Sequence, residues 1–433
     1  MVPAARIAAA IEILADILAR RRPAPDALKD WGLSHRFAGS GDRAAIAGLV
    51  YDALRRKASS AYLMGDESAR AIVLGMLRRE RALDPAQIEG LFDGSRFAPP
   101  PLSEKERETL ACADLKNAPA HVAGDYPEWL DPAFARAFGA ERAQEGAALA
   151  SRAPLDLRVN LLKGDRDRAL SELSDLRPKP SRWSPWGLRV ALAADAKSPA
   201  IHAEPAFIKG LVEVQDEGSQ LATLFAGAKP AEQVLDLCAG AGGKTLALAA
   251  MMQNKGQLYA TDSDKRRLAP IYERLARSGA RNVQVRTPRA DDGGLDDLNG
   301  RLDLVVIDAP CTGTGSWRRN PDAKWRLRPG ALALRLKEQA ALLDRAVRLL
   351  KPGGRIAYIT CSVLPEENGD QVRAFIAGHA DFAVVPPAEV MRQLGEQAFM
   401  FGKAARRISE EGLLMTPCTT DTDGFFVSLM RRA

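Results

Sequence analysis

The stretch Leu304-Val-Val-Ile-Asp-Ala-Pro-Cys-Thr-Gly-Thr-Gly315 joins an apolar, β-branched run directly to a cysteine. A second stretch, Ile356-Ala-Tyr-Ile-Thr-Cys-Ser362, has the same form. Each run predicts a buried strand, so Cys311 and Cys361 would both emerge at the carboxyl end of a strand. In open α/β sheets that edge is where ligands bind. Two thiols that meet there indicate covalent chemistry rather than packing.

Around these stretches, strands and helices alternate from about residue 205 onward. The alternation predicts a doubly wound sheet in which parallel strands dominate. We therefore expect residues 205–433 to form one α/β domain. Its expected strands are 234–238, 257–261, 282–286, 302–307, 355–360 and 425–430.

The first 125 residues look entirely helical. Apolar residues recur at helical spacing from Ile7 to Leu18, and Ser103 with Glu106 predicts a capping box at the start of a later helix. Several of these helices end in arginine or lysine. The basic ends either complement helix dipoles or form a basic surface along RNA phosphates.

Residues 126–204 are expected to hold a linker helix and a small α+β domain. Apolar residues alternate from Leu155 to Leu161, and the run from Gly187 to Leu192 predicts a second strand. Trp183 and Trp186 precede that run, and we expect them to pack in a core rather than to stack on bases. The chain is thus expected to have three domains.

Composition limits the class of protein. The most apolar N-terminal stretch is interrupted by Glu12 and Asp16, which argues against a signal peptide and a membrane span. Five cysteines without regular spacing favour a reducing cytoplasm, and four scattered histidines give no metal-ligand pattern. A formal charge of +6 favours a polyanionic partner. We expect a cytoplasmic protein that holds no metal and contacts no membrane.

A glycine-rich turn, Cys238-Ala-Gly-Ala-Gly-Gly-Lys-Thr245, follows the first expected strand of the α/β domain. It lacks the first glycine of a P-loop and the third glycine of the dinucleotide fingerprint. Asp262 ends the next strand, where a carboxylate can accept hydrogen bonds from both ribose hydroxyls. This pairing favours a nucleoside cofactor without a pyrophosphate, most commonly S-adenosylmethionine. The alternative is a simple turn, with Asp262 capping a helix.

Two thiols beside such a cofactor fit methylation of cytosine at C5. That carbon is a poor nucleophile until a thiolate adds to C6 and makes the ring an enamine. Asp308 is placed to neutralise the charge that develops at N3 or N4, and a second cysteine could assist product release. Two alternatives stay open: an RNA-binding scaffold with an inactive methyltransferase core, and a methyltransferase for an exocyclic amine, which needs no thiol.

Residues from about 205 to the end resemble the Sun/Nop family of RNA (cytosine-5)-methyltransferases, and the whole chain resembles its RsmB-like branch, which acts on bacterial ribosomal RNA. The N-terminal helices, including Asp42-Arg43, are similar to the NusB-type RNA-binding domain of that branch. The motifs that carry the resemblance are Val214-Gln-Asp-Glu-Gly-Ser-Gln220, Leu235-Asp-Leu-Cys-Ala-Gly-Ala-Gly-Gly-Lys-Thr245, Asp308-Ala-Pro-Cys-Thr-Gly-Thr-Gly315, Arg318-Arg-Asn-Pro-Asp322 with Trp325, and Thr360-Cys-Ser-Val-Leu-Pro-Glu-Glu-Asn368.

The resemblance implies roles for single residues. Cys361 would be the nucleophile and Cys311 would help to release the product, whereas DNA cytosine methyltransferases use the thiol of their Pro-Cys motif as the nucleophile. S-adenosylmethionine would be held by Asp262, Asp308 and the turn, with Lys244 also near the reacting atoms. The turn residues are Cys238, Ala239, Gly240, Ala241, Gly242, Gly243 and Lys244, and the residues expected beside RNA are Arg318, Arg319, Lys324 and Arg326.

The sequence departs from the family pattern in two places. Ala241 stands where the family usually has proline. The aspartate that usually contacts the adenine amine is replaced by Arg289, with Asp291 nearby as a possible substitute. Taken together, the sequence predicts a monomeric, S-adenosylmethionine-dependent rRNA (cytosine-C5)-methyltransferase that acts on 16S ribosomal RNA.

Overall fold

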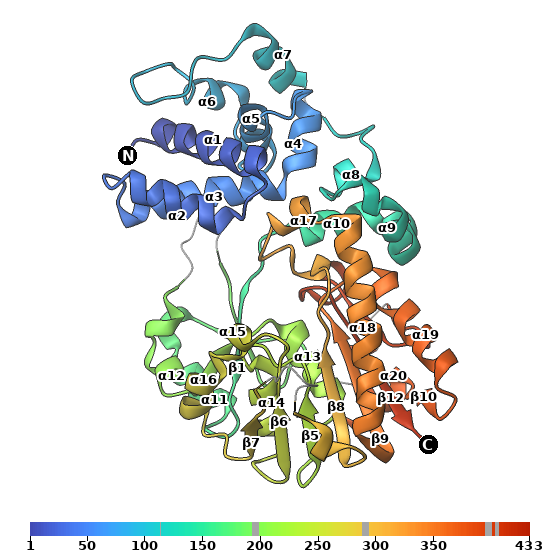
Figure 1. Cartoon of the computed structure of the whole chain (residues 1–433). Helices are drawn as coiled ribbons and strands as arrows, with labels where there is room; N and C mark the ends of the chain where they lie inside the picture. Colours follow the sequence, from blue (N-terminus) through green and yellow to red (C-terminus); the bar gives the residue numbers. More distant parts are fainter. Residues whose placement is uncertain (113, 193–198, 288–293, 395–400, 403–406) are drawn as a thin grey trace. The chain divides into compact units, whose positions relative to one another are not determined.

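The computed structural model describes residues 1–112, 114–192, 199–287, 294–394, 401–402 and 407–433 (Figure 1). The described chain divides into two compact units. One is built from Met1–Arg152 together with Trp317–Arg328, and is called the helical unit below. The other holds the rest of the described residues, and is called the catalytic unit.

The helical unit confirms the helices expected near the N-terminus. Its core contains the fully buried side chains of Leu14, Ile46, Leu54 and Ile72. The predicted capping box is present, because Glu106 accepts from the Ser103 backbone N–H at 2.8 Å and Ser103 Oγ accepts from the Glu106 N–H at 3.2 Å. The elements are α1 (Pro3–Arg20), α2 (Ala24–Ser34), α3 (Ser40–Arg55), α4 (Lys57–Met64), α5 (Ala69–Arg79), α6 (Pro85–Glu89), α7 (Glu104–Cys112), α8 (Ala120–Ala123), η1 (Glu128–Leu130), α9 (Asp131–Phe138), η2 (Gly139–Glu141), α10 (Arg142–Leu149) and α17 (Ala323–Arg326).

A small antiparallel sheet opens the catalytic unit, with strand order β2-β3-β1-β4. The last strand, β4, follows residue 204, so this sheet extends beyond the boundary expected there. Trp183 is buried, and its indole Nε1 donates to the Thr420 carbonyl at 3.0 Å, so it packs as expected. The elements are β1 (Leu155–Val159), α11 (Arg166–Glu172), η3 (Ser174–Leu176), β2 (Lys179–Pro180), β3 (Gly187–Val190), η4 (Ile201–Ala203), α12 (Pro205–Ile208) and β4 (Val212–Val214).

The large sheet has strand order β10-β12-β9-β8-β5-β6-β7, with β11 beside β12. The strands from β9 to β7 are parallel, whereas β12 runs antiparallel to β9. The strands are β5 (Gln233–Asp236), β6 (Gln257–Ala260), β7 (Val283–Val285), β8 (Leu302–Asp308), β9 (Leu350–Thr360), β10 (Phe382–Val384), β11 (Leu413–Met415) and β12 (Phe425–Arg432).

Helices cover both faces of this sheet. Side chains alternate along β8, so Leu304 and Val306 pack in one core while Val305 and Ile307 pack in the other. The doubly wound α/β class is therefore confirmed. The remaining elements are α13 (Glu217–Ala226), α14 (Gly243–Met251), α15 (Lys265–Leu268), α16 (Ile271–Ser278), η5 (Asp296–Leu298), η6 (Thr314–Ser316), α18 (Pro329–Leu349), η7 (Pro365–Glu367), α19 (Gly369–Gly378), α20 (Pro387–Gln393) and α22 (Pro417–Thr420).

The order of the parallel strands creates a switch point between β5 and β8. From β5 the chain moves outward through β6 and β7, and then returns to the other side of β5 as β8 and β9. At such a point the loops after neighbouring strands diverge and leave a crevice at the carboxyl edge. The glycine turn and Cys311 follow β5 and β8, which flank this point, whereas Asp262 and Cys361 follow β6 and β9, the next strands outward.

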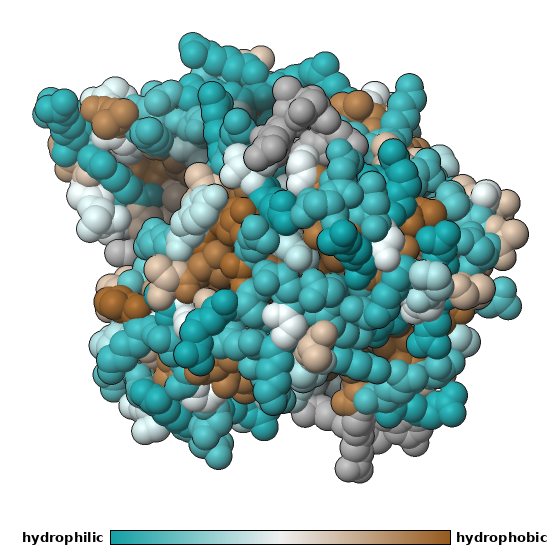
Figure 2. All heavy atoms as spheres, turned by 60° about the horizontal axis from the view of Figure 1, so that its bottom comes forward, coloured by the Kyte–Doolittle hydropathy of each residue, from teal (hydrophilic) through white to brown (hydrophobic). Residues whose placement is uncertain are grey.

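Polar residues cover most of the face drawn in Figure 2, with apolar residues showing in smaller patches between them. Among the described helices, none is both long and apolar enough to cross a membrane. Within the described ranges, no group of three or more histidine, cysteine, aspartate or glutamate side chains is arranged to hold a metal ion.

Candidate active site

The two cysteines that opened the sequence analysis lie together. Cys311 follows β8 and Cys361 follows β9, and these strands are parallel neighbours. The Sγ atoms are 3.3 Å apart, within hydrogen-bonding distance for sulfur, and no disulfide joins them. Both residues are half-buried, so neither thiol is enclosed by the core. The structure thus brings together the pair of thiols that the motifs predicted.

The loops that carry the thiols are cross-linked through their backbones. The Gly315 N–H donates to the Cys361 carbonyl at 2.9 Å, and the Gly424 N–H donates to the Gly315 carbonyl at 2.8 Å. A Cβ atom on Gly315 would lie 2.0 Å from the Gly424 carbonyl oxygen, so only glycine permits this contact. The start of β12 therefore closes against the Cys311 loop, a role for Gly424 that the motifs did not reveal.

A buried carboxylate, Glu367, anchors the Cys311 loop from the other side. It accepts from the Thr312 N–H at 2.8 Å, from the Thr312 hydroxyl at 2.5 Å and from the Gln339 amide at 3.1 Å. The same Gln339 amide donates to the Pro310 carbonyl at 3.0 Å. Sequence reasoning quoted Glu367 in a motif but gave it no role. Its place at the end of η7, two residues before the start of α19, carried no signal of that contact.

Lys244 and Asp308 form an ion pair next to the thiols. The ammonium Nζ lies 2.7 Å from Asp308 Oδ2, and also 5.2 Å from the centre of the Phe425 ring. Lys244 is buried, whereas about a third of the Asp308 side chain is exposed (35%). An ammonium and a carboxylate at this edge can together hydrogen-bond the polar edge of a base.

The turn after β5 faces the end of β6 as expected. Asp262 is buried, and its Oδ2 accepts from the Gly240 N–H at 2.9 Å. Gly240 and Gly242 have φ values of +50° and +86°, a region that favours glycine. Ala241 stands where the resemblance leads us to expect proline. Its backbone carbonyl accepts a hydrogen bond from the Arg274 guanidinium at 2.9 Å.

These residues fit a nucleoside cofactor. A cavity at the carboxyl edge is lined by Cys238, Thr261, Asp262, Arg267 and Pro310, among others. The Asp262 carboxylate accepts from the Gly240 N–H through Oδ2 and from the Asp264 N–H through Oδ1, and the Arg267 guanidinium lies 3.5 Å from Oδ1. A carboxylate that lines a cavity can also accept from the two hydroxyl groups of a ribose, and this contact stays a prediction.

Burial raises the pKa of two further groups under the turn. Burial raises the pKa of Asp236 to about 7, and the nearby carboxylates of Asp308 and Asp262 add to the shift. Its Oδ2 accepts from the Thr245 hydroxyl at 2.7 Å. Burial also raises the pKa of the Cys238 thiol well above its usual range. Cys238 therefore contributes a neutral side chain, as expected for a packing residue.

The four residues expected beside RNA divide into two pairs. Arg319 and Arg326 are exposed. Arg318 and Lys324 are buried, with exposed fractions of 2% and 0%. Both side chains are thus packed inside this structure, and the expected contact of Arg318 and Lys324 with RNA stays a prediction.

Lys324 is instead a packing residue of the helical unit. Its ammonium donates to the backbone carbonyls of Arg55 and Asp125 at 2.9 and 2.7 Å. Burial lowers its pKa to about 7. The neighbouring Trp325 donates from Nε1 to the Leu54 carbonyl at 2.6 Å. Arg289 and Asp291, the two candidates for the adenine-contacting position, lie outside the described residues.

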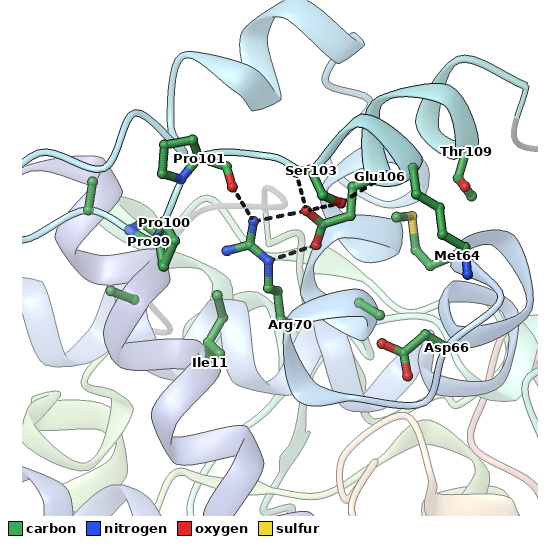
Figure 3. A pocket seen from close by; sticks show the side chains of 14 residues that line it. Ile11, Met64, Asp66, Arg70, Pro99, Pro100, Pro101, Ser103, Glu106 and Thr109 are labelled. Atoms are coloured by element: carbon green, nitrogen blue, oxygen red, sulfur yellow. Dashed lines mark hydrogen bonds and ion pairs between the residues drawn. The ribbon is translucent and has the colours of Figure 1, made fainter.

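The helical unit has a hollow of its own, of about 610 Å³. Figure 3 shows Arg70 pointing across it toward Glu106, and the two side chains form a double ion pair at 2.7 and 3.1 Å. Arg70 Nη2, which also donates to Glu106, reaches the Pro101 carbonyl at 3.1 Å. Because this charge is matched by a carboxylate, the hollow adds little to a basic surface. None of the expected catalytic residues lines it.

Fold and site together define a Rossmann-like methyltransferase with two neighbouring thiols at the carboxyl edge of its sheet. Comparison with known proteins narrows that class. The model of the family described as 16S rRNA methyltransferase RsmB/F matches residues 224–431, and a ferredoxin-like domain described as RsmF/B-like matches residues 126–197. The chain belongs to the RsmB/F family of 16S rRNA methyltransferases.

Individual relatives agree with this assignment. Ribosomal RNA small subunit methyltransferase B of Sodalis glossinidius is 33% identical over 81% of this chain and 74% of the relative. The protein of the same name from Salmonella newport is 36% identical over 70% of this chain and 68% of its own. The crystal structure of PH0851 is 25% identical, covers 100% of this chain and 99% of that one, and superposes with a TM-score of 0.72. The predicted class of enzyme, an rRNA methyltransferase, is thereby confirmed.

Proposed function

We propose that this protein methylates C5 of a cytosine in 16S ribosomal RNA, through a transient bond between Cys361 and C6 of the base. The observation that carries the proposal is the pair of thiols, 3.3 Å apart, beside the Lys244–Asp308 ion pair. A methyltransferase that attacks from an exocyclic nitrogen needs neither thiol. The family and the names of the relatives supply the small-subunit RNA.

Each residue of the site has a separate role in the proposed reaction. The Cys361 thiolate bonds to C6, which places electron density on C5. Lys244 and Asp308 hydrogen-bond the N3–N4 edge and offset the charge that develops on the ring. Once its sulfur is bonded to C6, Cys361 carries no charge, so the Cys311 thiol can release its proton to water. After C5 has gained its methyl group, the Cys311 thiolate takes up the C5 proton while the bond between Cys361 sulfur and C6 breaks. The product leaves, and Cys361 regains its thiolate.

The same geometry supports S-adenosylmethionine as the methyl donor. Bound there, it would supply an electrophilic methyl group on a sulfonium. Asp262 would hold its ribose hydroxyls, and the Cys238–Lys244 turn would approach its polar part through the backbone. The turn and Asp262 follow β5 and β6, whereas the thiols follow β8 and β9, so cofactor and base would meet at the switch point.

The base must leave its stack to reach Cys361, so we infer a target in a single-stranded or looped segment. The exposed Arg319 and Arg326 remain candidates for contacts with its phosphates. We place the reaction in the cytoplasm and assign the active form to a single chain, since every residue used above comes from one chain.

Replacing the nucleophile tests the proposal. The Cys361→Ala variant should lose all transfer of labelled methyl groups to small-subunit RNA, because it lacks the sulfur that we propose bonds to C6. Cys112→Ala is the matched control, since Cys112 is exposed on α7, and it should keep wild-type activity. Bisulfite sequencing of RNA from a deletion strain and its parent identifies the cytosine. Full activity of Cys361→Ala would reject Cys361 as the nucleophile, and full activity of a variant that lacks both Cys311 and Cys361 would favour an exocyclic amine as the acceptor. RNA binding without turnover by the wild type would favour a scaffold.

The second thiol has a different expected phenotype. A Cys311→Ser variant should add to the base and methylate it but release it slowly, so a covalent protein–RNA adduct should accumulate. The adduct is measured as a protein band of retarded mobility that ribonuclease shifts back. If Cys311→Ser turns over at the wild-type rate without any adduct, Cys311 has no part in release.

A further inference from the structure

The two thiols form a coupled pair. With their sulfur atoms 3.3 Å apart, ionisation of one opposes ionisation of the other, because two negative charges would stand side by side. In the reactive form the pair therefore shares one proton, and the thiol donates a hydrogen bond to the thiolate. Whichever sulfur lacks the proton is the one that can attack.

Glu367 breaks the symmetry of this pair. It is fully buried on η7, and its carboxylate accepts from three donors: the Thr312 N–H, the Thr312 hydroxyl and the Gln339 amide. A carboxylate accepts all of these bonds, whereas a protonated acid would also need an acceptor for its own proton. Glu367 thus places a negative charge beside the residue that follows Cys311.

That charge acts on Cys311. The pKa of the Cys311 thiol is raised well above its usual value, by the hydrogen bond with Cys361, by burial, and by the charges of Cys361 and Glu367. The Gly313 N–H opposes the shift but does not reverse it. The nearby Tyr358 hydroxyl donates to the Glu367 backbone carbonyl at 2.7 Å.

The other ionisable groups around the pair do not offset Glu367. Lys244 on α14 is matched by Asp308 at the end of β8, at 2.7 Å. Cys238, after β5, is held neutral by burial, which raises its pKa. Within the described residues, Glu367 is therefore the charge bonded directly to the Cys311 loop without a cationic partner.

We propose that Glu367 is a positioning residue that fixes the Cys311 loop and directs the shared proton to Cys311, which leaves Cys361 as the attacking sulfur. The inference rests on the proposed function, and it gives a reason why Cys361, rather than Cys311, would be the nucleophile. Glu367 does not touch the base. It acts through Thr312 and the electrostatics of the pair.

Alkylation of the full-length chain by iodoacetamide reads out each thiol separately. The reagent forms a carbon–sulfur bond with a thiolate and releases iodide, so its rate follows the thiolate fraction. Initial rates at each cysteine are measured by peptide mass spectrometry from pH 6 to pH 9. The exposed Cys112 serves as an internal reference for reagent activity. In the wild type, Cys361 should react before Cys311.

Three variants separate charge from shape. Glu367→Gln keeps an oxygen that accepts from Thr312 but removes the charge, so the Cys311 rate at a given pH should rise, by about tenfold for each unit by which its pKa falls. Glu367→Asp keeps the charge and should keep the wild-type order. Glu338→Gln is the matched control, since Glu338 lies next to Gln339 on α18 but is partly exposed and pairs with Arg335. It should change neither rate.

The outcomes are distinct. An unchanged order and unchanged pH profiles in a folded Glu367→Gln variant would overturn the inference. If that variant does not fold, the wild type still decides, because faster alkylation of Cys311 than of Cys361 contradicts the proposal by itself. Loss of methylation in Cys361→Ala bears on the proposed function alone. A chain that fails to methylate RNA but shows the alkylation order set by Glu367 would reject the function and keep this inference.

Discussion

At the scale of single residues, Asp236 shows how a buried carboxyl group near the site can lower the stability of the folded chain when it is ionised. The carboxyl group ends β5 beneath the glycine turn and is fully buried. Its Oδ2 accepts from Thr245, but its Oδ1 has no hydrogen-bond partner among the described residues. Burial therefore favours the protonated acid, and the pKa rises to about 7.

This shift has a definite sign in stability. The pKa of Asp236 is higher in the folded chain than in the unfolded one, so the folded chain holds a proton that the unfolded chain releases. The contribution of Asp236 to stability is then fully present below pH 4 and is lost as the pH rises through 7. An asparagine mimics the neutral acid at every pH and can still accept from Thr245.

We therefore predict that Asp236→Asn gains stability over the wild type as the pH rises. Between pH 5 and pH 8 the difference in free energy of unfolding should grow by about 3 kcal/mol. Thermal unfolding of both proteins across that range measures it. A difference that stays constant with pH would show that Asp236 is ionised in the folded chain. Asp303→Asn is a control on the same domain, because that carboxyl is partly exposed and its pKa is lowered rather than raised.

At the scale of elements, α17 and the residues around it belong to the helical unit although the chain reaches them from the catalytic unit. Trp317 stacks on Phe134 with ring centres 6.0 Å apart, and Asp322 accepts from the Ala24 N–H at 3.2 Å. Together with Lys324 and Trp325, these contacts make the segment Trp317–Arg328 part of the packed interior. From the basic residues of this segment we had expected an exposed surface beside RNA.

Replacing Lys324 tests that interpretation. Lys324→Met keeps the volume of the side chain but leaves the buried carbonyls of Arg55 and Asp125 without their donor. We expect a loss of about 2–4 kcal/mol in the stability of the helical unit, since each unpaired buried carbonyl costs roughly 1–3 kcal/mol. Differential scanning calorimetry measures it. Arg328→Met is the control, because Arg328 is exposed in the same segment. If both variants unfold at the same temperature, Lys324 does not stabilise the helical unit, and its expected contact with RNA gains support.

Strands with a long apolar run could be predicted from the sequence, whereas short strands with few alternating residues could not. The strands that became β5, β6, β8 and β9 are apolar runs that end in motif residues, so their place and their shared edge followed from the sequence. The three-residue strands β10 and β11 were missed. Such short edge strands carry too few alternating residues to be separated from loops, and they exist because β12 offers them a partner.

The site shows the same division. The thiols, Asp308, Lys244 and Asp262 were predictable because each stands at the end of a strand, where topology alone brings side chains together. Glu367 was not, since its partners are a backbone N–H and a hydroxyl of another loop. No pattern of residue types in the sequence predicts a hydrogen bond between a glutamate and the backbone of a distant loop. The burial of Arg318 and Lys324 could not be predicted either, because charged residues are normally exposed.

At the scale of the whole molecule, the domain order along the chain was predicted as three consecutive stretches. The helical unit is instead discontinuous, because it takes in Trp317–Arg328 from far along the sequence. Local patterns could not show this, since the contacts that hold the segment reach partners more than 150 positions away, as Lys324 does at Arg55 and Asp125 and Trp325 at Leu54.

That discontinuity governs the timing of biosynthesis. Domains generally fold as units in the order in which the ribosome delivers them. Here the first part to emerge stays incomplete until residue 328 has left the exit tunnel, and until then the sites later filled by Trp317, Lys324 and Trp325 are open to chaperones and to misassembly. A gene cut after Arg152 would produce that unfinished intermediate permanently.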